Sequence, residues 1–257
     1  MLTINHFLTK VGLILTLFLI IPLNSFANDA GQTIKACAEP WPPFDYIEDG
    51  NVQGKDVQVN EKLFQQLGVS LKIIIMPWKQ CWMLVKSGKV DAAFMVSKKQ
   101  QRQMDVYYSQ TPSNNLNYVW VTNSDINKEK VCQQTVCPNL EKNNWKVGLV
   151  TANSYSQNLL NCFKNKASSV LYQPTLASAL RKLLLNQTQL MPMVKSIAEY
   201  YKLQANIDNL HICQTTLFSK DYYTVFSKKS TFESQKYASI EAVKSAYDQA
   251  LAREINH

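Results

Sequence analysis

The sequence has few histidines and, beyond its first residues, no long hydrophobic run. Only three histidines occur in 257 residues, and His211 alone stands away from both ends of the chain. Without clustered histidines the cysteines have no partners for a mixed zinc site, so a metal centre is disfavoured. After the first thirty residues, no segment approaches the ~20 apolar residues that a membrane-spanning helix needs.

Other patterns are missing as well. No stripe of interleaved aromatic and basic residues occurs, and the cations are scattered in ones and twos, as in Lys98-Lys99, which argues against nucleic-acid binding. No Ser, His and Asp set for nucleophilic catalysis is readable. The net charge of +8 favours anionic ligands or simply keeps the protein soluble. The chain also lacks a Gly/Ser-rich linker, a short repeat and a low-complexity tract.

The N-terminal segment is typical of an export signal. Lys10 precedes an apolar run over 11–21, and the small residues Ser25 and Ala27 stand where a signal peptidase reads the chain. No cysteine ends the run, so a lipid-anchored form is not expected. We expect residues 1–27 to be a cleaved signal peptide and the mature protein to reside in the periplasm, with a retained N-terminal anchor as the alternative.

Short β-like runs alternate with amphipathic helices, which indicates an α/β fold. Asp56 and Thr175 are expected to cap helices, and Gly68 and Gly88 to end them. The halves have no flexible linker between them, so we expect two lobes that share a hinge. The expected strands are 33–38, 69–75, 91–96, 145–150 and 190–193, and the expected helices are 57–67, 78–87, 155–163, one capped by Thr175, and one within 232–253.

The chain resembles the family 3 extracellular solute-binding proteins, which include the periplasmic amino-acid-binding proteins of ABC importers. The resemblance covers about residues 33–112 well, is looser over 145–201, and returns at the end of the chain. The motifs that carry it are Trp41-Pro42-Pro43-Phe44, Gly54-Lys55-Asp56-Val57, Pro77-Trp78, Ser87-Gly88-Lys89-Val90-Asp91-Ala92-Ala93, Gln101-Arg102, Asn153-Ser154-Tyr155 and Tyr222-Tyr223-Thr224-Val225-Phe226.

This resemblance implies a type II periplasmic-binding-protein fold, with two α/β lobes that each contain a mixed sheet flanked by helices. Two crossover strands would join the lobes near 115–121 and 214–222. Lobe one would then comprise 28–117 and 220–257, and lobe two 118–219. A ligand would bind in the cleft between the lobes, which would close on it by a hinge motion.

The resemblance also implies a set of ligand-binding residues. Arg102 matches the family's arginine that grips a carboxylate, since a guanidinium fork suits that planar anion; a surface arginine is the alternative. Asn153 and Ser154 precede a helix, where they contact an anion or simply cap the helix. The complete expected set is Trp41, Phe44, Trp78, Ser97, Arg102, Asn153 and Ser154.

One departure from the family pattern concerns the ligand. Amino-acid binders carry an aspartate in lobe two that holds the ligand's ammonium group, but the corresponding stretch here, 190–195, has no acid. Glu39 is the candidate substitute from lobe one. An organic acid or a modified amino acid therefore becomes a stronger candidate than a standard amino acid.

All six cysteines follow the expected cleavage site, and an even count in an exported chain favours disulfides. Within the implied fold we expect pairing inside each lobe, which leaves the hinge free. A free thiol in the cleft or a bridge between lobes is the alternative. The expected pairs are Cys37–Cys81, Cys132–Cys137 and Cys162–Cys213.

Together these features predict a monomeric, non-enzymatic protein that captures a small carboxylate-bearing solute for ABC import or for a membrane sensor. No cofactor, metal or nucleic acid is expected. One alternative is a periplasmic enzyme on the same scaffold, such as a dehydratase, which would need a positioned acid or base in the cleft. The other is an interaction protein that has lost its ligand.

Overall fold

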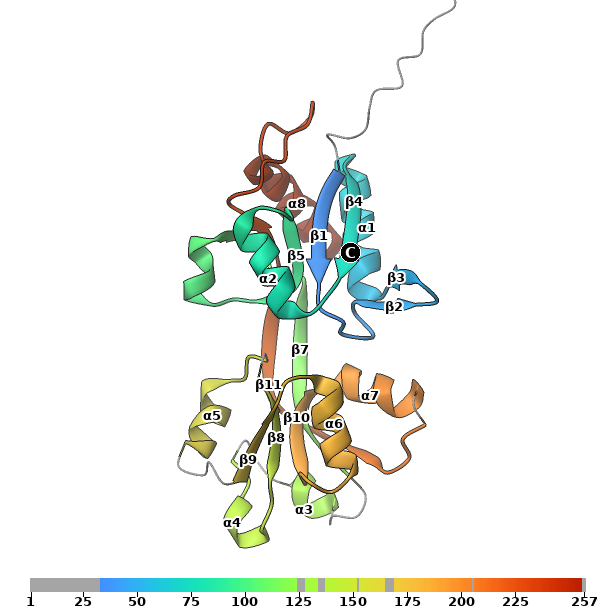
Figure 1. Ribbon diagram of the computed structural model, residues 1–257, viewed down its shortest axis with the longest axis vertical. Coiled ribbons are helices and arrows are strands. Elements are labelled where there is room, and N and C mark those ends of the chain that lie inside the picture. Colours follow the sequence, from blue (N-terminus) through green and yellow to red (C-terminus); the bar gives the residue numbers. More distant parts are fainter. Residues whose placement is uncertain are drawn as a thin grey trace, which may run out of the picture.

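The computed structural model describes residues 33–123, 128–133, 137–151, 153–164, 169–204 and 206–255. The expected signal peptide lies outside the described residues. The described part is two-lobed, with an upper and a lower lobe joined by two long strands (Figure 1). One sheet runs through both lobes in the order β4-β1-β5-β11-β7-β10-β8-β9, and β6 also pairs with β11.

The upper lobe is built on a parallel core in which β1 pairs with both β4 and β5. Helices cover this sheet, and a small hairpin, β2–β3, projects from one side (Figure 1). Its elements are β1 (Thr33–Ala38), β2 (Tyr46–Glu48), β3 (Asn51–Gln53), α1 (Lys55–Leu67), β4 (Ser70–Ile75), α2 (Trp78–Ser87), β5 (Ala92–Ser97), the 3₁₀ helix η2 (Gln100–Met104), β6 (Val106–Tyr108) and α8 (Ile240–Ile255).

The lower lobe continues the sheet through β10, which pairs antiparallel with β7 and parallel with β8. None of the helices in the described part of the chain is long and apolar enough to cross a membrane. The elements of this lobe are α3 (Lys128–Cys132), α4 (Leu140–Asn143), β8 (Val147–Val150), α5 (Gln157–Phe163), β9 (Val170–Gln173), α6 (Leu176–Leu184), β10 (Leu190–Val194) and α7 (Lys195–Gln204).

The strands that join the lobes are β7 (Asn114–Asn123) and β11 (Leu210–Ser227). They pair antiparallel from Leu210↔Asn123 in the lower lobe to Tyr222↔Asn114 at the upper lobe. Both expected crossover segments lie within these two strands. The two-lobed fold with two crossover strands is therefore confirmed, whereas the residue boundaries of the lobes stay a prediction.

Each lobe has its own apolar core. In the upper lobe the buried rings of Phe64, Phe226 and Tyr247 pack together, with centroids 5.4–6.4 Å apart. In the lower lobe Trp120 and Leu149 are among the fully buried side chains. A buried side chain of this kind contributes about 1.5–3 kcal/mol to the free energy of unfolding.

The expected capping residues of α1 and α2 are confirmed at the C-terminal ends of these helices but not at the start of α1. Gly68 and Gly88 end α1 and α2 in the left-handed conformation, with φ of 68° and 75°. The expected cap by Asp56 is wrong, because α1 begins at Lys55 and no side chain caps it. Backbone carbonyls of the preceding loop do so instead: Pro43 accepts from the Lys55 amide at 2.9 Å, and Phe44 from the Asp56 amide at 3.1 Å.

Three disulfides are formed, and only one of them was expected. The Cys37–Cys81 pair agrees with expectation. The expected pairs Cys132–Cys137 and Cys162–Cys213 are wrong, since the bonds are Cys132–Cys213 and Cys137–Cys162, with Cα separations of 5.1 and 5.3 Å.

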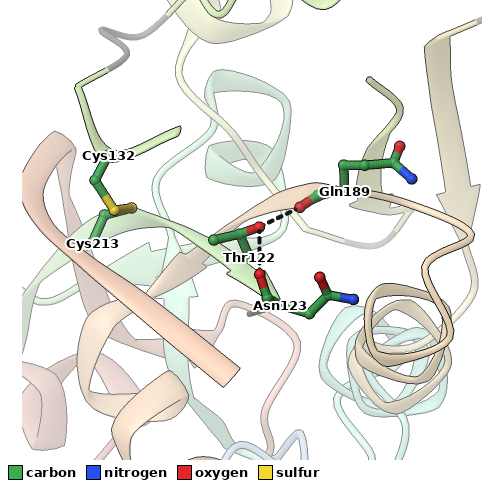
Figure 2. The surroundings of a disulfide bond; sticks show 5 residues. All are labelled: Thr122, Asn123, Cys132, Gln189 and Cys213. Carbon is green, nitrogen blue, oxygen red and sulfur yellow. Dashed lines mark hydrogen bonds between the residues drawn. A yellow bond between two sulfur atoms is a disulfide. The ribbon is translucent and has the colours of Figure 1, made fainter. Parts of the chain in front are cut away.

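The physical reason for this exchange lies in the packing of α3. That helix packs against β7 and β11, which brings Cys132 to Cys213 on β11. Figure 2 shows this bond beside the end of β7, where the Thr122 hydroxyl donates to the Gln189 carbonyl at 2.7 Å. Every disulfide still closes within one lobe, as the resemblance implied.

Candidate ligand-binding cleft

A cleft opens between the lobes and encloses about 40 Å³, roughly the space of three water molecules. The upper lobe supplies most of its lining, and the lower lobe supplies the loop after β8. Six of the seven expected ligand-binding residues line it. The lining residues are Glu39, Trp41, Trp78, Phe94, Met95, Ser97, Arg102, Asn153, Ser154 and Tyr222.

Arg102 is held from two sides by the upper lobe. Its Nη1 donates to the Ser97 carbonyl at 2.9 Å and to the Ser97 hydroxyl at 3.1 Å. Its guanidinium carbon lies 4.8 Å from the ring centroid of Trp78 and 5.3 Å from that of Trp82. The two indoles are stacked with centroids 5.7 Å apart, so they form a shelf under the cation rather than a separate binding cage.

The aromatic side of the cleft comes from the loop that follows β1. Trp41 is half-buried and meets the edge of Tyr222, with ring centroids 5.1 Å apart. Phe44 is buried and does not line the cleft; its ring lies behind Trp41 at 6.4 Å. The loop is closed by a bond from the Phe44 amide to the Trp41 carbonyl at 2.9 Å, so Trp41 is presented by a fixed turn.

Two buried carboxyl groups lie under this loop. Asp45 is fully buried, and neither of its carboxylate oxygens has a hydrogen-bond partner among the described residues. Burial, and secondarily the charge of Asp56, raises the pKa of Asp45 well above its ordinary value. Burial also raises the pKa of Asp56 to about 7, although hydrogen bonds from Asn114 and Asn60 oppose that shift.

The lower lobe contributes Asn153 and Ser154 from the loop between β8 and α5. The helix-capping alternative for Ser154 is wrong, because Ser156 caps α5 by accepting from the Leu159 amide at 3.3 Å. The loop is anchored by Tyr155, whose hydroxyl accepts from the Val150 amide at 2.9 Å. The polar groups of Asn153 and Ser154 are therefore not engaged in capping that helix.

Positive charge gathers at the cleft with one acid beside it. Glu39 lines the cleft and is half-buried, which raises the pKa of its carboxyl group. Lys220, on β11, directs its ammonium group to the Ser154 carbonyl at 2.5 Å. Burial, then the charges of Lys99 and Arg102, lowers the pKa of Lys220 to about 8.

Sequence reasoning missed three residues that line the cleft, Phe94, Met95 and Tyr222, and it missed Lys220 beside them. Tyr222 stands in a motif of the family resemblance, so that motif was a usable signal. Nothing local marked Lys220, which contacts the cleft-lining residue Ser154 because β11 passes beside the cleft. Met95 has a positive φ of 53° within a strand, a conformation that its side chain gives no reason to expect.

The stretch without an acid, 190–195, forms β10 and the first residue of α7. Lys195 there donates to Gln214 at 2.8 Å on the surface. In the ranges that the structure describes, no three His, Cys, Asp or Glu side chains are grouped closely enough to hold a metal ion.

Solved structures with the same fold include several binding proteins. An ancestral arginine-binding protein bound to arginine is 17% identical, with a TM-score of 0.71 over 88% of this chain and 93% of that one. A histidine kinase sensor domain with similarity to periplasmic binding proteins is 17% identical, with a TM-score of 0.69 over 89% and 93%. The amino acid ABC transporter substrate-binding protein AbpA from Streptococcus pneumoniae, bound to L-arginine, is 20% identical, with a TM-score of 0.65 over 89% and 91%.

At these identities the likeness establishes the fold. No curated protein matches the chain in sequence. The family model of the bacterial extracellular solute-binding proteins, family 3, matches residues 34–256, which include both lobes and both crossing strands. With its two-lobed architecture and a polar cleft between the lobes, this chain belongs to the bacterial extracellular solute-binding proteins, family 3.

Proposed function

We propose that this protein is a periplasmic receptor that captures a small carboxylate-bearing solute between its lobes and releases it unchanged to a membrane partner. The partner is an ABC permease or a sensor. Proteins from both settings occur among the similar structures. One is a substrate-binding protein of an ABC transporter, and another is a sensor domain of a histidine kinase. We further propose that the protein acts as a monomer, since one chain supplies both sides of the cleft.

The observation that carries this proposal is the state of Arg102. One edge of its guanidinium group is fixed by Ser97, and one face rests on the Trp78 and Trp82 rings. None of the three ion pairs found among the described residues includes it. A preoriented, half-buried cation without a carboxylate partner is suited to bind the carboxylate of a ligand.

The same lining supports binding rather than catalysis. Among the described residues that line the cleft, Glu39 is the only carboxylic acid, and none is a histidine or a cysteine. A dehydratase-type reaction requires a positioned acid or base with a partner that orients it. Ligand recovered after long incubation should therefore be chemically unchanged by mass spectrometry, and conversion that depends on Glu39 would instead establish an enzyme.

The test is a thermal-shift screen of the purified protein against amino acids, dicarboxylates, keto acids and aromatic acids. A ligand at about 100 times its dissociation constant stabilises a protein by about 2.7 kcal/mol, which gives a readable shift. The Arg102→Ala variant should lose about 2–5 kcal/mol of binding free energy, because a buried carboxylate would lose its partner.

The matched control is Arg181→Ala, which removes the same side chain from an exposed position on α6. This variant should bind the ligand as the wild type does. Equal affinity of the Arg102 and Arg181 variants would show that the ligand site lies elsewhere. Fractionation of cells that produce the full-length chain tests the location, and retention in the cytoplasm would contradict the periplasmic assignment.

A further inference from the structure

A second cation, Lys220, lies beside the cleft on β11, the strand that crosses between the lobes. Its ammonium group donates to the backbone carbonyl of Ser154, a cleft-lining residue of the lower lobe, at 2.5 Å. Arg102 belongs to the upper lobe, so the two cations approach the cleft from different parts of the molecule. Lys99 lies near both, close enough for its charge to be felt by Lys220.

This cluster is short of negative charge. Arg102 and Lys220 stand against one cleft-lining acid, Glu39. None of the ion pairs found among the described residues includes Lys99, Arg102 or Lys220. Like charges that are held together in a partly buried site repel each other unless a counter-ion arrives. The cleft is therefore charged in a way that one carboxylate does not neutralise.

We propose that the ligand is a small dianion, by which we mean a solute with two anionic groups, and that Arg102 binds one of these groups and Lys220 the other. This inference rests on the proposed function, because it places the solute in the same cleft. Lys220 then acts as a specificity-determining residue: it distinguishes a ligand with two negative charges from one with a single carboxylate.

The same charges act against a cationic ligand. The arginine that is bound in two of the similar structures would bring a second positively charged group into this cleft. Among the described cleft-lining residues, Glu39 is the single acid that could receive that group in addition to the ligand's ammonium, and burial raises the pKa of its carboxyl group. We therefore expect arginine to bind weakly or not at all.

Two sources share the dianion chemistry: dicarboxylic acids and acidic amino acids. They differ in the ammonium group, for which Glu39 is the available acceptor. The experiment measures affinity by calorimetry for matched pairs that differ in one negative charge. The pairs are succinate with succinamate, and glutamate with glutamine, with arginine as a single further ligand.

In at least one pair, the ligand with two carboxylates should bind about thirtyfold more tightly than its amide partner with one carboxylate, as expected for a close charge pair. Lys220→Gln should reduce that ratio to about one, and Lys220→Arg should restore most of it. The matched control is Lys146→Gln, an exposed lysine at the opposite end of β8 from Ser154. It should leave the ratio unchanged.

The outcomes separate this inference from the proposed function. If a monoanion binds with Arg102-dependent affinity and no dianion binds more tightly, the inference is overturned and the receptor function stands. If the dianions bind but Lys220→Gln keeps the full ratio, Lys220 is not the second anchor and the inference fails. If no dianion binds, it fails as well, and the wider thermal-shift screen then decides the receptor function.

Discussion

At the scale of single residues, Arg102 shows how the fold prepares a binding group. A flexible arginine side chain loses conformational entropy about several rotatable bonds when it binds an anion. Here the Ser97 carbonyl and the stacked indoles restrict it before a ligand arrives. The sequence predicted that Arg102 faces the cleft, but the indole shelf depends on η2 folding back over α2, which no local pattern indicates.

The two buried carboxyl groups of Asp45 and Asp56 differ in their hydrogen bonding. Asp56 accepts from Asn60 at 3.0 Å and from Asn114, the first residue of β7, at 2.7 Å. Asp45 has no such partners, so its charged form is the less favourable of the two. Through Asp56, the start of α1 is bonded to the start of the crossing strand β7.

This pair predicts an unusual pH dependence of stability. Both carboxyl groups have a folded-state pKa above the value in the unfolded chain, so the folded protein binds more protons between those values. The free energy of unfolding should therefore increase as the pH falls from about 8 to about 5. Asp45→Asn should flatten this slope, as measured by urea midpoints at several pH values.

The matched control is Asp49→Asn, which makes the same change at the exposed turn between β2 and β3. It should keep the wild-type slope. Asn60, Asn114 and the Tyr247 phenol are the other polar groups near Asp56, and the phenol stays protonated over this range because burial raises its pKa. A full slope in Asp45→Asn would show that Asp45 does not contribute to the pH dependence.

At the scale of secondary structure, the element types and their order were predictable, whereas their ends depended on tertiary contacts. Thr175 caps α6 as expected, because the Thr175 and Ser178 side chains form a local capping box. The start of α1 was not predictable, since its first amide groups are bound by the loop at Pro43 and Phe44. Helix signals within one segment are readable from sequence; signals supplied by a neighbouring loop are not.

Gly54, the residue before α1, lies against the loop that carries Trp41, and this contact predicts the effect of a substitution there. Its φ is 136°, and a Cβ atom there would lie 1.9 Å from the Phe44 carbonyl oxygen. Gly54→Ala should therefore displace the loop that carries Trp41, with a loss of about 1–3 kcal/mol in stability and a weaker affinity for the ligand. Calorimetry and urea unfolding measure the two effects.

Gly50→Ala is the appropriate control, because Gly50 also has a positive φ but no atom within 4 Å of the added Cβ. That variant should lose some stability through backbone strain and keep its ligand affinity. Equal affinity of the two variants would show that the position of the loop does not matter for binding.

The disulfides show a similar limit of sequence reasoning. Assignment to lobes could be predicted, since pairs that bridge distant lobes would oppose hinge motion. The exact partners in the lower lobe could not, because Cys132 meets Cys213 through the packing of α3 on β11. Nearness along the chain favoured Cys137, and nearness in the fold favoured Cys213.

At the scale of the whole molecule, one aromatic contact spans the lobes beside the cleft. Tyr46 on β2 of the upper lobe and Tyr200 on α7 of the lower lobe lie with ring centroids 5.7 Å apart. Such a pair contributes about 0.5–1.5 kcal/mol. Because it exists only when the lobes are close, it should stabilise the closed arrangement.

Tyr200→Ala should therefore shift the ligand-free protein toward open forms, by about threefold to tenfold in the ratio of closed to open molecules. Small-angle X-ray scattering should report a larger radius of gyration than for the wild type, and saturating ligand should reduce the difference. Tyr172→Ala, at an exposed position on β9, is the control and should leave the radius unchanged. An unchanged radius in Tyr200→Ala would contradict a role for this contact in closure.

The position of β11 late in the chain affects the order in which the two lobes fold during synthesis. Its first residues pair with β7 in the lower lobe, and its last residues pair with β5 and β6 in the upper lobe. A growing chain therefore cannot complete the upper-lobe part of the sheet until residue 227 has been made, and Cys132 must wait through 81 residues for its partner. Proteins with several structural units usually finish the N-terminal one first. Here both lobes are completed by the same late segment, so they mature together near the end of synthesis.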